Sequence, residues 1–341
     1  MQETFTTGHE DATLNYIRSV VVDYYDFDIQ CVAFEAHSDK FVCVLTTTAG
    51  EKFNVFVYFS VNGLDYEHYK YKRRESILQE VAFLQAVERE TDVRVPVPQA
   101  NRKGEFLTPI YIPSCNADTS LMVVSFIEGQ PMDPADEDYV EKCFHAGVCA
   151  AKLHQVSRKY FADFQSNDRP IHRHGWAIQI RNDICRGLPL GTVSPEDFDV
   201  ICDGLDYIDA VMTKLDSVEG SCGFVHTDLR AANFINTGDN VAPIDFSRTV
   251  YGYLVYDLGE MCAHMGGDDV DYAIMQGYTS ITPLTEEEMH FIEAFFILFV
   301  LSVIGEKTEL IGNEYVQVTT RRWVDELIPA LLAKEPIFKR I

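Results

Sequence analysis

The chain has 341 residues, of which 47% are hydrophobic and 24% charged. This composition excludes wholesale disorder and collagen-like or low-complexity classes, and the length favours two packed domains because single cores stop growing near roughly 250 residues. With 28 Lys and Arg against 53 Asp and Glu, the net charge is -25. We therefore expect neither nucleic acid nor an anionic membrane as a partner, since both would be repelled.

The first residues and the cysteines indicate a reducing compartment. The first fifteen residues are polar and acidic, without the basic start and apolar stretch of a secretory signal. The nine cysteines are scattered without a Cys-x-x-Cys pair, which indicates neither a disulfide framework nor a zinc site. The most apolar run, from Phe295 to Gly305, is shorter than the about 20 residues that a spanning helix needs. The sequence predicts a cytoplasmic protein in which this run is a buried core helix.

Residues 1–128 have the pattern of strands combined with one main amphipathic helix. From Gln30 to Ser60, β-favouring segments alternate with turn residues, which predicts an antiparallel meander. Residues 75–90 carry apolar side chains at helical spacing. Residues 105–113 and 120–127 then predict a β-hairpin that ends in a turn at 128–131.

Residues 129–341 have mainly helical patterns, at 138–156, 195–217, 255–278, 285–304 and 320–334. A short strand-and-loop block at 223–246 interrupts them, and polar residues cluster there between apolar flanks. The sequence thus predicts an α+β chain with a small β-rich region, 1–128, and a larger helical region, 129–341. We expect the chemistry to lie in the block at 223–246.

That block contains a constellation suited to phosphoryl transfer. His226, Asp228 and Asn233 have the spacing H-x-D-x-x-x-x-N, and Asp245 follows a short apolar strand. Phosphoryl transfer needs one carboxylate that orients and deprotonates the attacking hydroxyl, and oxygen ligands that hold Mg²⁺ against the nucleotide phosphates. Asp228 is the candidate base, Asn233 and Asp245 are the candidate metal ligands, and the His226 imidazole is suited to bracing the loop. The pattern His-x-Asp alone also fits a capped turn, but the full spacing favours the catalytic interpretation.

Together these residues resemble the aminoglycoside phosphotransferase and choline kinase-like superfamily, which has a bilobal protein kinase-like fold. The resemblance covers nearly the whole chain. Beyond the catalytic block it rests on four further segments with the order expected for that family: Val123–Gly129, Gly147–His154, Ile244–Gly259 and Gln276–Tyr278. It implies a kinase with ATP or GTP as co-substrate and Mg²⁺ as cofactor, and divides the chain into a nucleotide-binding lobe, 1–128, and a catalytic and acceptor-binding lobe, 129–341.

The resemblance also implies roles for individual residues. The hinge between the lobes falls at Ser125, Phe126 and Ile127, whose backbone would hold the edge of the adenine or guanine base. Arg230 would steady the transferred phosphate, or else form a salt bridge within its loop. Asp257 is expected to cap the start of its helix, with bracing of the catalytic loop as the second interpretation. We interpret His154 as a structural residue at a helix end.

The third strand departs from the pattern of kinase-like folds. Such folds usually carry a basic residue there, paired with a helix glutamate, to anchor the nucleotide phosphates. The expected position falls near Val57 or Tyr58, and neither side chain is charged. Glu80 is the candidate glutamate, and its partner would have to be one of four lysines at positions 40, 52, 70 and 72. Two smaller departures are a glycine-free loop at 35–40 and Ser247 in place of a second acidic residue.

Three functions remain open at this point. The first is a nucleotide-dependent phosphotransferase acting on a hydroxyl of a small molecule such as an aminoglycoside, amino alcohol or amino acid. The second is a catalytically weak pseudokinase used as a binding module, and the third is a Ser/Thr protein kinase. Seven acidic residues in the second lobe fit a cationic acceptor or a solvated helix face: Glu260, Asp268, Asp269, Asp271, Glu286, Glu287 and Glu288. The sequence carries no signal for an oligomeric state.

Overall fold

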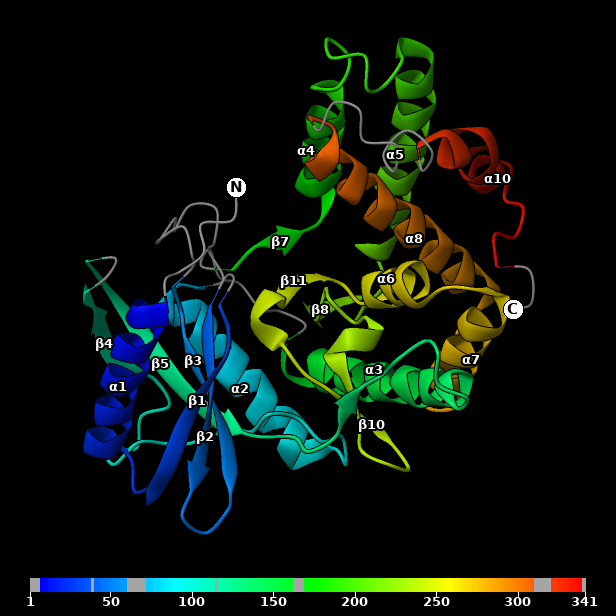
Figure 1. Ribbon diagram of the computed structural model, residues 1–341. Coiled ribbons are helices and arrows are strands. Elements are labelled where there is room, and N and C mark those ends of the chain that lie inside the picture. The colour runs from blue at the N-terminus through cyan, green and yellow to red at the C-terminus, as the bar shows by residue number, and fades with distance from the viewer. Residues whose placement is uncertain are drawn as a thin grey trace. The chain divides into compact units, whose positions relative to one another are not determined.

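The computed structural model describes residues 7–37, 40–59, 72–113, 116–161, 169–309 and 320–338. The chain divides into two compact units, Met1–Glu128 and Gly129–Ile341. Each unit is described by itself below (Figure 1).

The first unit is built on one antiparallel sheet in the order β1-β2-β3-β5-β4. Its strands are β1 (Ile29–His37), β2 (Phe41–Thr47), β3 (Lys52–Val57), β4 (Thr108–Ile112) and β5 (Ala117–Ser125). The meander β1-β2-β3 confirms the expected succession of strands, and β4 and β5 form the expected hairpin. The alternation of buried and half-buried residues along β2 shows that one face of the sheet is more deeply covered than the other.

Two helices cover the two faces of this sheet (Figure 1). Helix α1 (Thr7–Tyr24) packs Ile17 and Val21 against the face that carries Cys43 and Val55. Helix α2 (Arg74–Glu90) packs Ile77 and Val81 against the other face. The face under α2 carries three large side chains and one valine: Phe56, Tyr58, Met122 and Val124.

Helix α1 is absent from the sequence-based expectation, which has a single main helix in this region. Its apolar stripe is short, and among the residues whose burial is described Ile17, Val20 and Val21 are its buried side chains. The polar residues that precede this stripe conceal the helical period. Burial against the sheet, rather than local pattern, supplies the stability of such a helix.

The second unit is mainly helical, as expected. Its helices are α3 (Tyr139–Phe161), α4 (His174–Cys185), α5 (Pro195–Leu215), α6 (Val255–Met265), α7 (Asp268–Thr279), α8 (Glu286–Lys307) and α10 (Ile328–Ala333), and a π-helical turn, Trp323–Leu327, precedes α10. Two differences from expectation concern α4, which was not foreseen, and the segment 255–278. This segment is two helices, because Gly266 and Gly267 separate α6 from α7 and Gly267 has a φ of 123°.

Two small sheets flank the catalytic block. One has the order β10-β9-β6, formed by β6 (Gln130–Pro131), β9 (Phe234–Asn236) and β10 (Val241–Pro243). The other has the order β7-β11-β8, formed by β7 (Ile171–His172), β8 (Cys222–Val225) and β11 (Val250–Tyr253). The block therefore runs from the end of β8, through the hairpin β9-β10, to β11.

Helix α8 is the apolar centre of the second unit. It is long and apolar enough to cross a membrane, yet 61% of its most apolar window is buried inside the protein. Phe295, Leu298 and Leu301 pack there against residues of α4 and α5. The expectation of a buried core helix is confirmed, although the helix extends well beyond the apolar run.

Glycines allow α3 and α7 to cross at close range. A Cβ atom on Gly277 would lie 1.9 Å from the Phe144 carbonyl oxygen, and one on Gly147 would lie 2.1 Å from the Ile274 carbonyl oxygen. Any side chain at either position would push the helices apart. This crossing brings a residue of α3 and a residue of α7 into the support of the catalytic block.

Candidate active site

The loop after β8 carries the motif residues, and hydrogen bonds to the buried carboxylate of Asp257 hold it in place. Asp257, on the first turn of α6, accepts hydrogen bonds from the amides of His226 (2.9 Å) and Thr227 (2.9 Å), one with each oxygen. The Asp257 side chain is 1% exposed. Both oxygens serve the loop, so Asp257 braces it rather than capping its own helix. Charge-assisted bonds of this kind are roughly twice as strong as neutral ones.

A relay of two further side chains fixes Asp257. His154 Nε2 lies 3.2 Å from Asp257 Oδ2, and His154 Nδ1 lies 3.0 Å from the Tyr278 hydroxyl oxygen. Burial lowers the pKa of His154, although Asp257 partly opposes that shift, so the ring is neutral near pH 7. The carboxylate can only accept, so Nε2 carries the proton and Nδ1 accepts from Tyr278. The expectation that His154 stands at a helix end is wrong, because it lies well inside α3 and is completely buried.

Thr227 has a backbone conformation that its side chain disfavours. Its φ is 60°, in the left-handed region, which is an outlier for a β-branched residue. Two bonds hold it there: its amide donates to Asp257, and its hydroxyl donates to the Arg248 carbonyl oxygen at 2.8 Å. The turn redirects the chain immediately before Asp228, so the orientation of that carboxylate depends on this strained residue.

One oxygen of the Asp228 carboxylate forms a salt bridge with Arg230. The Arg230 Nε atom lies 3.2 Å from Asp228 Oδ1, and the Asp228 side chain is 11% exposed while that of Arg230 is 49% exposed. The Asp228 carbonyl oxygen accepts from the Asn233 side-chain amide at 2.8 Å. The structure therefore gives Arg230 the salt bridge within the loop that was one of its two expected roles.

Asn233 and Asp245 lie at the same end of the β9-β10 hairpin. Phe234 and Pro243 are paired across the hairpin, and the Ile244 amide donates to the Asn233 carbonyl oxygen at 2.9 Å. Asp245, with a φ of 62°, follows directly, and Asp245 Oδ1 accepts from the Ser247 hydroxyl at 2.7 Å. Ser247, which departs from the family pattern, thus hydrogen-bonds the aspartate two residues before it.

The donors at this end of the hairpin fit Mg²⁺. The Asn233 nitrogen is occupied by the loop, which turns its amide oxygen away from that bond, and the oxygen has no hydrogen bond with the described residues. An amide oxygen and a carboxylate are the hard donors that Mg²⁺ accepts alongside water and phosphate oxygens. His226 supports the segment by placing Nε2 3.0 Å from the Ile244 carbonyl oxygen.

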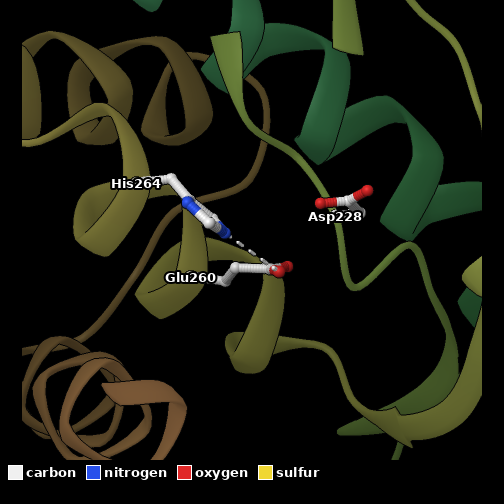
Figure 2. A group of neighbouring side chains, drawn as sticks. All are labelled: Asp228, Glu260 and His264. Atoms are coloured by element: carbon white, nitrogen blue, oxygen red, sulfur yellow. Dashed lines mark ion pairs between the residues drawn. The ribbon is translucent and has the colours of Figure 1, made fainter. Parts of the chain in front are cut away.

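A second group of titratable side chains adjoins Asp228. One oxygen of Asp228, one oxygen of Glu260 and one ring nitrogen of His264 lie within 4.8 Å of one another (Figure 2). Glu260 is 1% exposed, whereas the other acidic residues of its sequence-based group are exposed or half-buried. The sequence noted Glu260 only as part of an acidic set and missed His264. Glu260 and His264 are four residues apart, a spacing that places both side chains on the same face of a helix, and this could have linked them in the sequence.

The residues of the expected hinge segment, Ser125 to Ile127, differ in their backbone hydrogen bonds. The Ser125 amide donates to the Val97 carbonyl oxygen, and the Phe126 amide donates to the Lys52 carbonyl oxygen. Ile127 has no hydrogen bond with the part of the chain that the structure describes. All three line a cavity of about 420 Å³ together with residues 91–95 and 97. Glu88 of α2 and Glu128 complete the lining of that cavity, and Glu80 is not among its lining residues.

Two buried charges share the face of the sheet on which α2 packs. Lys40 directly precedes β2 and is 6% exposed, with its ammonium 4.4 Å from the centre of the Phe56 ring. Glu80 is 3% exposed and lies on α2, three residues after Ile77, which packs on this face. Lys52 instead pairs with Glu128 at 2.9 Å near the hinge, and Lys70 lies outside the described residues.

The fold is that of the protein kinase-like enzymes. A model of the phosphotransferase enzyme family APH matches residues 66–292. The chain belongs to this family.

Individual relatives and solved structures agree with this assignment. A stretch of 106 residues is 29% identical to a probable ethanolamine kinase of Nematostella vectensis, covering 30% of this chain and 28% of that one. A structure of the amicoumacin kinase hAmiN in complex with AMP-PNP, Ca²⁺ and Ami has a TM-score of 0.63 at 18% identity, covering 97% and 98% of the two chains. A microcompartment-associated aminopropanol kinase has a TM-score of 0.67 at 15% identity, covering 93% and 97%. At these identities the structures establish the shared fold.

Proposed function

We propose that the protein is a kinase that transfers the γ-phosphoryl group of ATP or GTP to a hydroxyl group of a small molecule. The proposal rests mainly on the loop after β8, which both oxygens of Asp257 hold in place by accepting hydrogen bonds from its amides. Within it, Asp228 has one oxygen on Arg230 and a carbonyl oxygen held by Asn233. Membership of the phosphotransferase family and the names of the relatives support the same reaction class.

In this reaction Asp228 acts as the general base. The acceptor oxygen forms a bond to the γ-phosphorus, the bond from that phosphorus to its bridging oxygen breaks, and the electron pair of that bond leaves with the nucleoside diphosphate. The hydroxyl proton passes to Asp228, whose second oxygen is not engaged by Arg230. Arg230, half exposed beside the base, is suited to the transferred phosphoryl oxygens.

The remaining residues orient the reactants. Asn233 and Asp245 would hold Mg²⁺, which supplies charge neutralisation for the phosphates when bound. Ser125, Phe126 and Ile127 are assigned to the nucleotide base, and Ile127, whose amide and carbonyl have no hydrogen bond with the described residues, is suited to hydrogen-bond the base edge. His226 and Asp257 keep the loop in position.

For the phosphate anchor we assign Lys40 in place of a third-strand lysine. Lys40 precedes β2, whereas the usual anchor lies on the third strand. Because Phe41 pairs with Val57 in the antiparallel ladder of β2 and β3, Lys40 lies beside Tyr58, next to the usual position. Its side chain is on the same face as Glu80, the usual partner of the anchor. Lys72 is also buried, but it lies before the first residue of α2, eight positions ahead of Glu80 in the sequence.

Mg²⁺-dependent phosphate transfer tests the proposal against the pseudokinase alternative. ATP and GTP are each supplied with a panel of amino alcohols, aminoglycosides and amino acids, with and without EDTA, and thermal stabilisation by nucleotide is measured in parallel. Stabilisation by nucleotide together with transfer to a small hydroxyl compound is expected. Stabilisation without transfer to any acceptor would favour the pseudokinase, and transfer to protein substrates alone would favour the Ser/Thr kinase.

The proposal concerns a cytoplasmic enzyme with a nucleotide and a small-molecule acceptor as its partners. The net charge of -25 supports neither nucleic acid nor an anionic membrane as a partner.

A further inference from the structure

Ser247 is a buried serine whose hydroxyl contacts one of the two residues assigned to the metal. The Ser247 Oγ atom donates to Asp245 Oδ1 at 2.7 Å, and Ser247 is 2% exposed. A hydroxyl has a single proton, so this bond uses the only donor of the side chain. Hydrogen bonds from a hydroxyl to a carboxylate are short and roughly twice as strong as neutral ones. The bond therefore fixes the orientation of the Asp245 carboxylate.

The local turn does not need this hydrogen bond. Asp245 directly precedes the 3₁₀ turn Phe246–Arg248, a position from which a carboxylate commonly accepts from the first amides, yet its side chain makes no such capping bond. Thr249 closes the turn instead, because its amide (3.1 Å) and its hydroxyl (2.6 Å) both donate to the Phe246 carbonyl oxygen. The contact of Ser247 with Asp245 thus serves the carboxylate rather than the turn.

Hydrogen bonds from outside the turn hold the backbone next to Ser247. The Arg248 carbonyl oxygen accepts from the Thr227 hydroxyl at 2.8 Å, and the Thr249 carbonyl oxygen accepts from the buried guanidinium of Arg169. The hydroxyl of Ser247 is therefore presented from a supported backbone. An ion that approaches Asp245 meets a carboxylate whose orientation is already determined.

Mg²⁺ and Ca²⁺ differ in how they use a carboxylate. Mg²⁺ requires near-ideal octahedral geometry at about 2.0–2.1 Å, whereas Ca²⁺ takes about 6–8 oxygens at about 2.3–2.6 Å and accepts a carboxylate through one or both of its oxygens. A carboxylate that keeps one oxygen on a hydroxyl offers an ion the other oxygen alone. This arrangement suits Mg²⁺ and deprives Ca²⁺ of a ligand.

We propose that Ser247 determines the metal specificity of the site: by holding Oδ1 it makes Asp245 a ligand through Oδ2 alone, which favours Mg²⁺ over Ca²⁺ when nucleotide is bound. This inference rests on the proposed function, in which Asn233 and Asp245 hold the ion. Ser247 acts through Asp245, so it is a positioning residue. The protein then contributes one carboxylate and one neutral amide, and the nucleotide phosphates complete the charge.

A second interpretation makes the Ser247 hydroxyl itself a ligand, since serine and threonine hydroxyls also bind Mg²⁺. A ligand must be reachable by the ion, and Ser247 is 2% exposed whereas Asp245 is half-buried. This difference favours the positioning role. The two interpretations predict different effects of removing the hydroxyl, because loss of a direct ligand weakens the binding of both ions alike.

The test measures the Kd of AMP-PNP for the full-length protein by calorimetric titration, in saturating Mg²⁺, in saturating Ca²⁺ and in EDTA. AMP-PNP resists transfer of its terminal phosphate, so the readout does not depend on turnover. The wild type should bind it at least about 10-fold more tightly with Mg²⁺ than with Ca²⁺. In Ser247→Ala that preference should fall at least about 10-fold, because loss of a hydrogen-bond partner of a ligating group typically changes metal affinity by about 10- to 100-fold.

Thr249→Val is the matched control. It removes a buried hydroxyl from the same turn and leaves the bond between Ser247 and Asp245 in place. Its preference for Mg²⁺ over Ca²⁺ should equal that of the wild type. An equal loss of preference in both variants overturns the inference, because the effect would then belong to the turn.

Equal affinity with the two ions in the wild type, or no gain over EDTA with either, also overturns the inference. An unchanged preference in Ser247→Ala does so too, and a loss of affinity that is the same for both ions would make the hydroxyl a ligand. Phosphate transfer alongside such a result would leave the proposed function standing. A preference that depends on Ser247 supports the inference even if no acceptor is phosphorylated and the proposed function fails.

Discussion

At the scale of single residues, the geometry of the proposed base, Asp228, depends on buried side chains outside its own loop. Asp257 holds two loop amides and is itself held by His154, which Tyr278 fixes in turn. The orientation of Asp228 therefore depends on three helices, α3, α6 and α7, rather than on the loop alone.

Replacing Asp257 with Asn tests that support. The variant loses the charge that accepts two amide donors, and its own NH₂ group would face one of them. We expect the free energy of unfolding to fall by about 2–4 kcal/mol and kcat to fall at least about 10-fold, with little change in the KM for nucleotide. Denaturant unfolding and steady-state kinetics measure both. Unchanged stability would show that the loop does not depend on this carboxylate.

Lys40→Met tests the assignment of the phosphate anchor. Methionine retains the packing on Phe56 but removes the charge, so kcat/KM for ATP or GTP should fall by roughly 10²-fold. Lys52→Met, which breaks only the partly exposed pair with Glu128, is the control and should have less than about a 3-fold effect. A large effect of Lys52→Met or Lys72→Met with a normal Lys40→Met would assign the anchor elsewhere.

The sequence identified the residues that share one local motif and missed those that meet only in the fold. Asp228, Asn233 and Asp245 lie within 18 positions of one another, so their spacing carried the prediction. His154, which bonds Asp257, comes from α3, and Tyr278, which bonds His154, comes from α7, 124 positions further along the chain, so no local pattern links them. Glu260 could be noted as acidic, but its burial and its unsatisfied oxygen are properties of the packed structure.

At the scale of elements, the close crossing of α3 and α7, rather than an amphipathic pattern, brings together the residues that hold the loop after β8. Gly147 and Gly277 were visible in the sequence as parts of the family resemblance. The structure gives their physical reason, because the backbones of α3 and α7 approach too closely for a Cβ atom. The same crossing lets His154 reach Tyr278.

Gly277→Ala should therefore destabilise the protein by about 2 kcal/mol or more, since the new Cβ meets backbone that cannot move aside easily. The control is Gly175→Ala in α4, where no atom lies within 4 Å of the new Cβ, and alanine should leave stability unchanged or raise it slightly. Thermal or denaturant unfolding of the two variants makes the comparison. Equal effects at both positions would contradict the close-crossing account.

The elements that the sequence predicted poorly are those whose ends or stability depend on tertiary contacts. Helix α1 has a short apolar stripe and is stabilised by the sheet. The segment 255–278 has apolar residues at helical spacing on both sides of two adjacent glycines, and these glycines divide it into α6 and α7.

At the scale of the whole molecule, the sequence anticipated two parts from length and pattern, and the contacts divide the chain at residue 128. A net charge of -25 is unfavourable for an anionic nucleotide, so in the proposed reaction activity should depend on the cations assigned to the phosphates: Lys40, Arg230 and the Mg²⁺ proposed for Asn233 and Asp245. The same acidic character agrees with an acceptor that carries an ammonium group.

The proposed mechanism requires Asp228 to be the general base of a phosphotransferase. The direct measurement is turnover of ATP or GTP with the acceptor that the panel identifies, by the wild type and by Asp228→Ala, with nucleotide-dependent thermal stabilisation recorded for both. We predict that Asp228→Ala retains the stabilisation and loses kcat by a factor on the order of 10² or more, because a positioned base is removed. Near-normal turnover in Asp228→Ala would contradict the proposed mechanism.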